Sequence, residues 1–165
     1  MSNDQTFKVG NRDWRNFLNQ QFYSECQLIT AINARYWLTG KTIKQHTKKY
    51  ERLVDLVGAR GGSAIGIGKV HKKFGIEVDK EYNIIFGITP DMIPLELTVW
   101  NHNYGYHSVL AVDCEIKSEA VRITNFGRVT TSHGWIFFEE LQYYIKKAVI
   151  KKGEWIGRRF RIKPT

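Results

Sequence analysis

Cys26 stands at a position where a cysteine side chain can act as a nucleophile. The stretch NQQFYSECQLITAINARYWLTG, residues 19–40, places it at the start of an apolar helical pattern, with Gln20 six positions upstream. A helix N-terminus carries partial positive charge and unpaired N–H groups, which lower the pKa of a thiol and favour the reactive thiolate. The sequence therefore predicts a nucleophilic Cys26. The alternative is a small apolar residue on a buried helix.

A thiol nucleophile needs an imidazole to take its proton and a third group to orient that imidazole. His107 begins the strand-like run HSVLAVDCEI, and Asn125 ends the next such run, AVRITN. The 18 residues between them (125 − 107) suit two antiparallel strands joined by a tight turn through EIKSE. Such a hairpin would bring His107 beside Asn125, which favours His107 over the other four histidines.

The order of glutamine, cysteine, histidine and asparagine resembles that of the papain-like cysteine peptidases, over roughly residues 14–145. The resemblance implies an oxyanion hole formed by the Gln20 side chain and the Cys26 N–H, and a triad of Cys26, His107 and Asn125. The short chain is more similar to the bacterial branch that removes double-glycine leader peptides than to papain itself.

Several residues depart from the family pattern. Glu25 and Gln27 flank the cysteine, where the family usually has small residues, glycine or tryptophan. We expect the charge of Glu25 to raise the thiol pKa and to repel acidic substrates. Asn125 stands where the leader-peptidase branch usually has aspartate. Phe126 is expected to shield the hydrogen bond between His107 and Asn125, as the family's tryptophan does.

The order of helix-like and strand-like patterns along the chain predicts an α+β fold. Apolar spacing predicts helices over 24–39, with Ser24 as N-cap and Gly40 as the stop, and over 42–57 and 67–74. β-branched and aromatic runs then predict antiparallel strands, interrupted by one late helix near 137–150. We expect a single papain-like domain over residues 1–165, with a helical half (about 12–75) packed on a sheet half (about 76–165).

The glycine-rich segment GARGGSAIGIGK, residues 58–69, does not match a phosphate-binding loop. Lys69 is followed by Val70 instead of serine or threonine, and no strand precedes the segment. The sequence therefore predicts a connector between two helices.

The composition limits the classes of partner. No apolar run approaches the length of a membrane span, and the N-terminal stretch lacks the apolar region of a secretory signal. The formal net charge of +9 favours acidic partners. Cys114 lies in an apolar strand-like run and is expected to be an inert thiol. No cofactor, disulfide or metal site is expected, because no Cys/His spacing suits zinc.

The sequence thus predicts a cytoplasmic thiol-dependent hydrolase that cleaves a peptide or amide bond in a peptide or protein substrate. Trp100, Asn103 and Tyr106 are candidates for substrate binding. One alternative is an inactive papain-like module within a larger assembly, such as a phage virion, bound to a second copy or to a virion partner. Another is a basic nucleic-acid-binding domain, although nucleic acid is not the expected partner.

Overall fold

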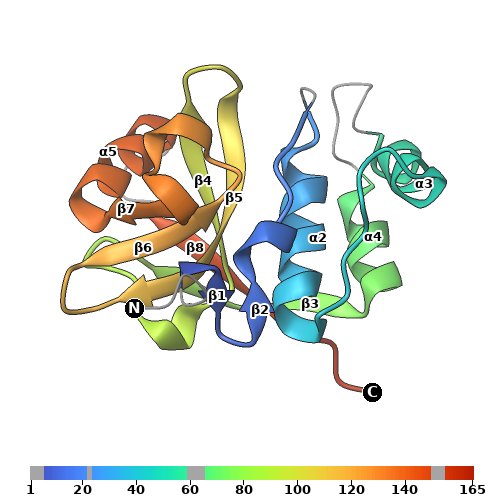
Figure 1. The fold of residues 1–165 in the computed structure, drawn as a ribbon, viewed down its shortest axis with the longest axis horizontal. Coiled ribbons are helices and arrows are strands. Elements are labelled where there is room, and N and C mark those ends of the chain that lie inside the picture. The colour runs from blue at the N-terminus through green and yellow to red at the C-terminus, as the bar shows by residue number, and fades with distance from the viewer. Residues whose placement is uncertain (1–5, 22–23, 59–65, 150–154) are drawn as a thin grey trace.

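The computed structural model describes residues 6–21, 24–58, 66–149 and 155–165. Within these ranges the protein is α+β, as the sequence predicts (Figure 1). The main sheet has the strand order β3-β8-β4-β5-β6-β7, and every neighbouring pair is antiparallel. Its strands are β3 (Ile76–Asn83), β4 (Leu95–Asn101), β5 (Gly105–Glu115), β6 (Ala120–Thr124), β7 (Trp135–Phe137) and β8 (Ile156–Ile162).

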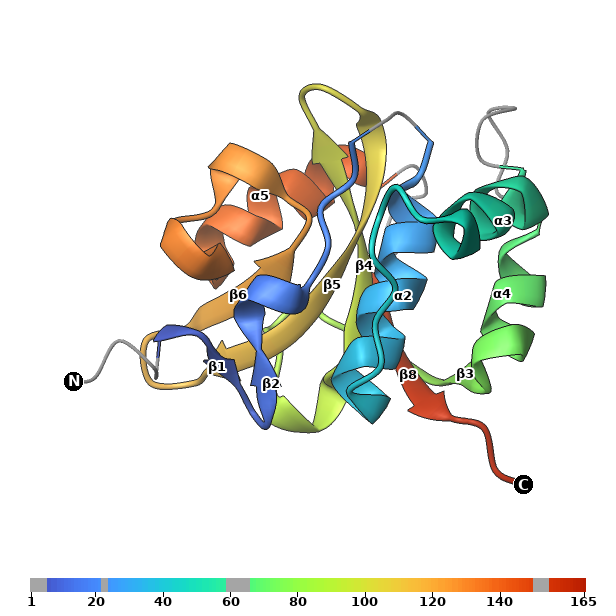
Figure 2. The ribbon, with the colours of Figure 1, turned by 45° about the vertical axis from the view of Figure 1, so that its right-hand side comes forward.

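The helices cover the two faces of this sheet. The N-terminal helices α2 (Cys26–Thr39), α3 (Lys48–Val57) and α4 (Ile67–Phe74) lie on one side, and α5 (Phe138–Ala148) lies on the other (Figures 1 and 2). Alternate residues of β5 divide accordingly. Val109 belongs to the apolar cluster that includes Leu141 of α5, whereas Leu110 belongs to the cluster that includes Ala34 of α2.

The predicted helices are present, but two of them begin later than expected. The helix α2 begins at Cys26, with Glu25 and not Ser24 at the N-cap position, because Ser24 has a left-handed backbone (φ 68°). The helix α3 begins at Lys48 because the Thr47 hydroxyl accepts a hydrogen bond from the Tyr50 N–H at 3.2 Å. The expected first turn from residue 42 is therefore loop.

Most predicted strands are confirmed, including the hairpin of β5 and β6. The structure adds the short β7 and a small hairpin of β1 (Lys8–Val9) and β2 (Arg12–Asp13), which the sequence analysis did not predict. The predicted connector between α3 and α4 falls largely on residues 59–65, which lie outside the described residues.

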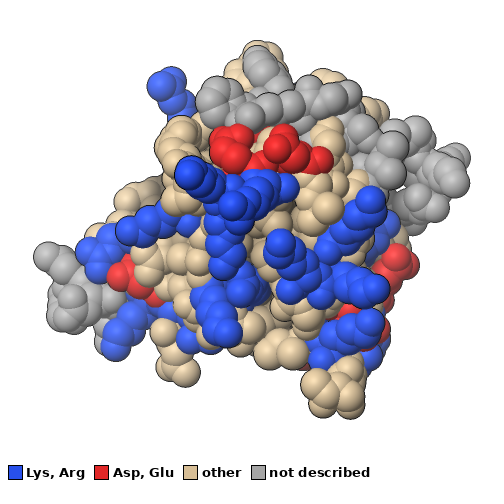
Figure 3. Space-filling model, turned by 90° about the vertical axis from the view of Figure 1, so that its right-hand side faces the viewer, with Lys and Arg blue, Asp and Glu red and all other residues tan. Residues whose placement is uncertain are grey.

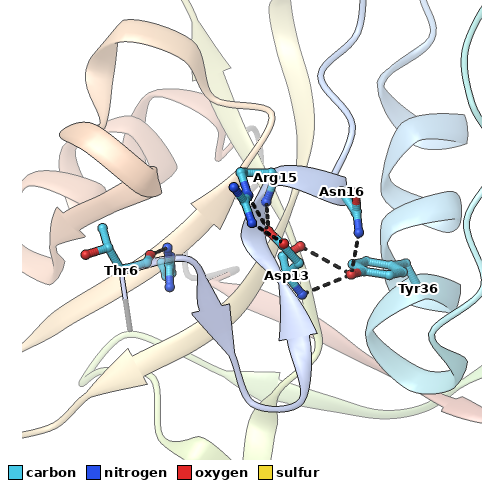
Figure 4. A network of polar contacts seen from close by, with 6 residues as sticks. Thr6, Asp13, Arg15, Asn16 and Tyr36 are labelled. Atoms are coloured by element: carbon cyan, nitrogen blue, oxygen red, sulfur yellow. Dashed lines mark hydrogen bonds and ion pairs between the residues drawn. The ribbon is translucent and has the colours of Figure 1, made fainter. Parts of the chain in front are cut away.

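The N-terminal hairpin is tied to α2 by a polar network around Tyr36 (Figure 4). The Tyr36 hydroxyl accepts hydrogen bonds from the Asp13 N–H at 3.0 Å and from Asn16 Nδ2 at 3.1 Å. Arg15 binds the Asp13 carboxylate at 2.7 Å, and Arg12 Nε donates to the Tyr36 carbonyl at 2.8 Å. These contacts fix the chain that leads on to Gln20.

No helix within the described ranges combines the length and the apolar character that a membrane span requires.

Candidate active site

Two contacts between α2 and β5 determine where Cys26 lies. Thr30 Oγ1 is 3.0 Å from Ser108 Oγ, and Trp37 Nε1 donates to the Val112 carbonyl at 3.0 Å. Helix and strand therefore run in the same direction. Cys26 lies four residues before Thr30 on the same helix face, about 6 Å back along the axis. That distance spans about two strand residues, so Cys26 lies near the start of β5, where the Ser108 N–H contacts its sulfur.

The Cys26 thiol is half-buried and surrounded by main-chain donors. Burial raises its pKa, while the N–H groups of Ser108, Gln27 and Cys26 itself lower it. The negative charge of Glu96 on β4 raises the pKa further. The net effect is a raised pKa, so the predicted lowering by the helix terminus is outweighed by burial. Cys26 rests as a neutral thiol at neutral pH.

His107 lies near the start of β5 with its ring buried. The side chain is 1% exposed, and Nε2 lies 2.5 Å from the carbonyl oxygen of Asn125. A carbonyl oxygen only accepts hydrogen bonds, so Nε2 carries the proton and Nδ1 of the neutral ring is an unprotonated base. Within the described residues, Nδ1 has no hydrogen-bond partner. Burial lowers the pKa of His107, which keeps the ring neutral at pH 7.

Two aromatic rings lie nearly parallel to the His107 imidazole. The centroid of Tyr104 lies 5.4 Å away at an interplanar angle of 23°, and that of Phe126 lies 6.3 Å away at 28°. Phe126 is itself buried and packs against Tyr144 of α5. These rings restrict rotation of the imidazole and separate its hydrogen bond to Asn125 from water.

Asn125 joins Gln20 to His107. Its Oδ1 accepts from the Gln20 N–H at 2.8 Å, and its Nδ2 donates to Gln20 Oε1 at 2.9 Å. The contact with His107 is made by the main-chain carbonyl, whereas the family resemblance implies the side chain. Asn125 has a left-handed backbone (φ 60°), which asparagine adopts more readily than most residues.

Gln20 is positioned from the helical side of the molecule. The side chain of Asn33 on α2 accepts from the Leu18 N–H at 2.8 Å and donates to the Leu18 carbonyl at 3.1 Å. Gln20 follows two residues later and is 8% exposed. The structure thus brings Gln20, Asn125 and His107 into one contiguous hydrogen-bonded set. The Cys26 sulfur is in contact with the N–H of Ser108, the residue after His107.

The predicted substrate-binding residues lie in different places. Asn103 lines a groove of about 620 Å³ beside the site. Trp100 and Tyr106 lie outside this groove and form an edge-to-face pair at 5.3 Å, with Tyr106 53% exposed. The groove is bounded by Asn19, Gln20, Asn101, His102, Asn103, Tyr104, Asn125, Phe126, Gly127, Arg128 and Val129.

Three polar residues next to the cysteine were not among the predicted site residues: Thr30, Glu96 and Ser108. The Ser108 hydroxyl donates to Glu96 Oε2 at 2.8 Å and contacts Thr30. In the alternating run LELTVWN, Glu96 shares the strand face opposite Leu95 and Leu97, and in many antiparallel sheets that face meets solvent. The structure covers that face with α2.

The remaining candidate groups are separate from this site. Cys114 lies near the end of β5, is half-exposed, and has a pKa raised chiefly by burial. Among the described residues, no three His, Cys, Asp or Glu side chains gather in an arrangement suited to a metal ion.

Comparison with models of known protein families finds no match to this chain. A search of curated proteins likewise finds no significant match. The functional argument therefore depends on the geometry of the site.

Proposed function

We propose that the protein is a thiol-dependent hydrolase that cleaves a peptide or amide bond with Cys26 as nucleophile and His107 as general base. The observation that carries this proposal is the 2.5 Å contact of His107 Nε2 with the Asn125 carbonyl, which assigns the ring proton to Nε2. It leaves the Nδ1 lone pair available on the residue that precedes Ser108, whose N–H contacts the Cys26 sulfur. A base with an unprotonated nitrogen and a neighbouring thiol is the minimum that acyl transfer requires.

The reaction begins from a neutral pair. His107 Nδ1 removes the Cys26 proton as the sulfur attacks the substrate carbonyl, and the resulting imidazolium donates that proton to the leaving amine. The developing oxyanion is stabilised by the Cys26 N–H at the start of α2 and by the Gln20 side-chain amide. Water, activated by the same base, then hydrolyses the thioester and restores the thiol. No cofactor enters these steps.

Acylation by p-nitrophenyl acetate tests this proposal without knowledge of the natural substrate. In a Cys114→Ser background, mass spectrometry measures acetyl transfer to Cys26 and its turnover. We expect His107→Ala to slow acylation about a hundredfold or more, as loss of a general base typically does. The matched control is His46→Asn, an exposed histidine of the loop before α3 that lies outside the groove and should leave the rate unchanged. Asparagine suits its left-handed backbone (φ 65°). Equal acylation in wild type and His107→Ala would refute the hydrolase and favour an inactive scaffold.

A second function, nucleic-acid binding, has separate support in the charge of the helical face. Lys and Arg gather on the side of the molecule formed by α3 and α4 (Figure 3). The exposed cations there are Lys48, Lys49, Arg52, Lys69, Lys72 and Lys73. None of them forms an ion pair within the described parts of the chain. By contrast, the β8 arginines Arg158, Arg159 and Arg161 each bind an acid of β3.

The chemistry of this face suits the phosphates of a nucleic acid backbone. Among the described residues, none of the large apolar side chains that are exposed lies on α3 or α4. Binding to a short DNA duplex should weaken steeply with salt, with a slope of about 0.9 per phosphate contact. Lys72→Gln/Lys73→Gln should reduce that slope by about 2. The matched pair Lys146→Gln/Lys147→Gln on α5 should leave it unchanged, and equal effects of both pairs would refute this function.

A further inference from the structure

A chain of three polar side chains runs beneath Cys26, between α2 and the sheet. The Ser108 hydroxyl donates its only hydrogen to Glu96 Oε2 at 2.8 Å. Ser108 Oγ also lies 3.0 Å from Thr30 Oγ1. Because the Ser108 hydrogen is already used, Thr30 must be the donor in the second contact. The hydrogen bonds therefore run in one direction, from α2 through β5 to the carboxylate on β4.

This chain is coupled to the sulfur through Ser108 and through helix geometry. Cys26 lies one turn before Thr30 on the same face of α2, and the Ser108 N–H acts on the sulfur. The charge of Glu96 acts on the sulfur as well and opposes its ionisation. Ser108, the residue that follows His107, thus links the helix α2 to the Glu96 carboxylate.

We propose that Glu96 is a positioning residue that holds the first turns of α2 on β5 and keeps the proton on Cys26 until His107 removes it. The inference rests on the proposed function, which supplies the role of His107. Its consequence is a cysteine that reacts slowly with electrophiles and oxidants at rest, because only a small fraction of it is thiolate. The thiol ionises only when the base takes its proton during attack on a bound substrate.

The other charged groups around the sulfur do not replace Glu96. Glu25, the preceding residue, is fully buried and faces Tyr50 of α3, whose pKa is raised by burial and by that carboxylate. On the β5 side, the neutral His107 supplies the base. Burial raises the pKa of the Glu96 carboxyl group itself. The Ser108 hydrogen bond and the charge of Arg158, which stands opposite Glu96 in the sheet register, partly offset that effect and favour the charged form.

Charge and hydrogen bonding can be separated by substitution. Glu96→Gln keeps an oxygen that accepts from Ser108 and removes the negative charge, whereas Ser108→Ala breaks the hydrogen-bond chain and keeps the charge. A purely structural role would make Ser108→Ala the more harmful change and leave the ionisation of Cys26 unaffected by Glu96→Gln. The proposed role predicts that only Glu96→Gln makes the thiol easier to ionise.

The experiment measures the rate of Cys26 alkylation by iodoacetamide as a function of pH in the Cys114→Ser protein. Each unit by which the thiol pKa falls raises the rate about three- to fourfold below that pKa, because the thiolate fraction grows tenfold while its nucleophilicity declines. We expect Glu96→Gln to accelerate alkylation about threefold or more at neutral pH. The control Glu115→Gln removes an exposed carboxylate at the far end of β5 and should change nothing.

An alkylation profile of Glu96→Gln that coincides with that of Glu115→Gln would overturn the inference. Titration of the Cys26 thiolate by ultraviolet absorbance, in the protein with Glu96 intact, gives a second test that does not depend on the variant folding. A thiol pKa at or below that of free cysteine there would overturn it too. Neither readout needs turnover, so failure of the hydrolase proposal appears separately, as acylation that is insensitive to His107→Ala.

Discussion

Replacing Asn125 tests whether its carbonyl or its side chain orients His107. Asn125→Ala removes two hydrogen bonds to Gln20, of 2.8 and 2.9 Å, worth together about 2 kcal/mol. Alanine at φ 60° adds about 1 kcal/mol of backbone strain. We therefore expect a loss of about 3 kcal/mol in the free energy of unfolding, measured by urea denaturation with a circular dichroism readout.

Two matched variants separate these contributions. Asn125→Gly removes the same hydrogen bonds without the strain of a left-handed alanine, so its loss should be smaller than that of Asn125→Ala. Asn125→Asp keeps an acceptor for the Gln20 N–H, and Gln20 turns its amide so that Nε2 donates to the carboxylate. Its stability at neutral pH should lie within about 1 kcal/mol of wild type.

Acyl transfer by the same variants gives the decisive result. The carbonyl of residue 125 survives every substitution, so the His107 tautomer is retained wherever the protein is folded. Asn125→Ala should therefore lose less than about tenfold in acylation rate, against about a hundredfold or more for His107→Ala. If folded Asn125→Ala loses as much as His107→Ala, the side chain orients the imidazole and the main-chain role described above is wrong.

Two further perturbations have results that follow from burial. Arg122 is 2% exposed, lies over the Trp14 ring, and donates to the carbonyls of Thr6, Lys8 and His133. Arg122→Met leaves these oxygens without their donor and should lower the free energy of unfolding, measured in urea, by about 3 kcal/mol. A decrease below about 1 kcal/mol would contradict this role. Burial lowers the pKa of both His71 and His107, so the unfolded chain binds more protons and the free energy of unfolding should fall as pH drops below about 6.5. Urea titrations above and below that pH check the sign, and His107→Gln should flatten the dependence.

Local pattern was sufficient for the elements that hold His107. The spacing from His107 to Asn125 predicted the hairpin, and the structure places the two residues in contact at 2.5 Å. The same spacing contains no information on which atom of Asn125 makes that contact. The atom that contacts His107 depends on Gln20, which lies 105 residues away in the sequence and hydrogen-bonds the Asn125 side chain.

The errors of sequence analysis at Cys26 have a common physical cause. A helix start predicts a lowered thiol pKa, but the pKa also depends on burial and on Glu96 of a distant strand. Glu96 itself was overlooked because alternation distinguishes the two faces of a strand and does not show what covers each face. The late start of α3 has a different origin, since the Thr47 cap outweighed the apolar Ile43.

The two residues near the far end of α2 anchor that helix to different neighbours. Tyr36 is held by the N-terminal hairpin and Trp37 by the Val112 carbonyl. Successive helix residues point about 100° apart, because there are 3.6 residues per turn, so these anchors together fix the rotation of the helix about its own axis. They act some 16 Å from Cys26 along that axis. The direction in which the sulfur points is thus set in part at the far end of its own helix, and a substitution there would turn the nucleophile without contacting it.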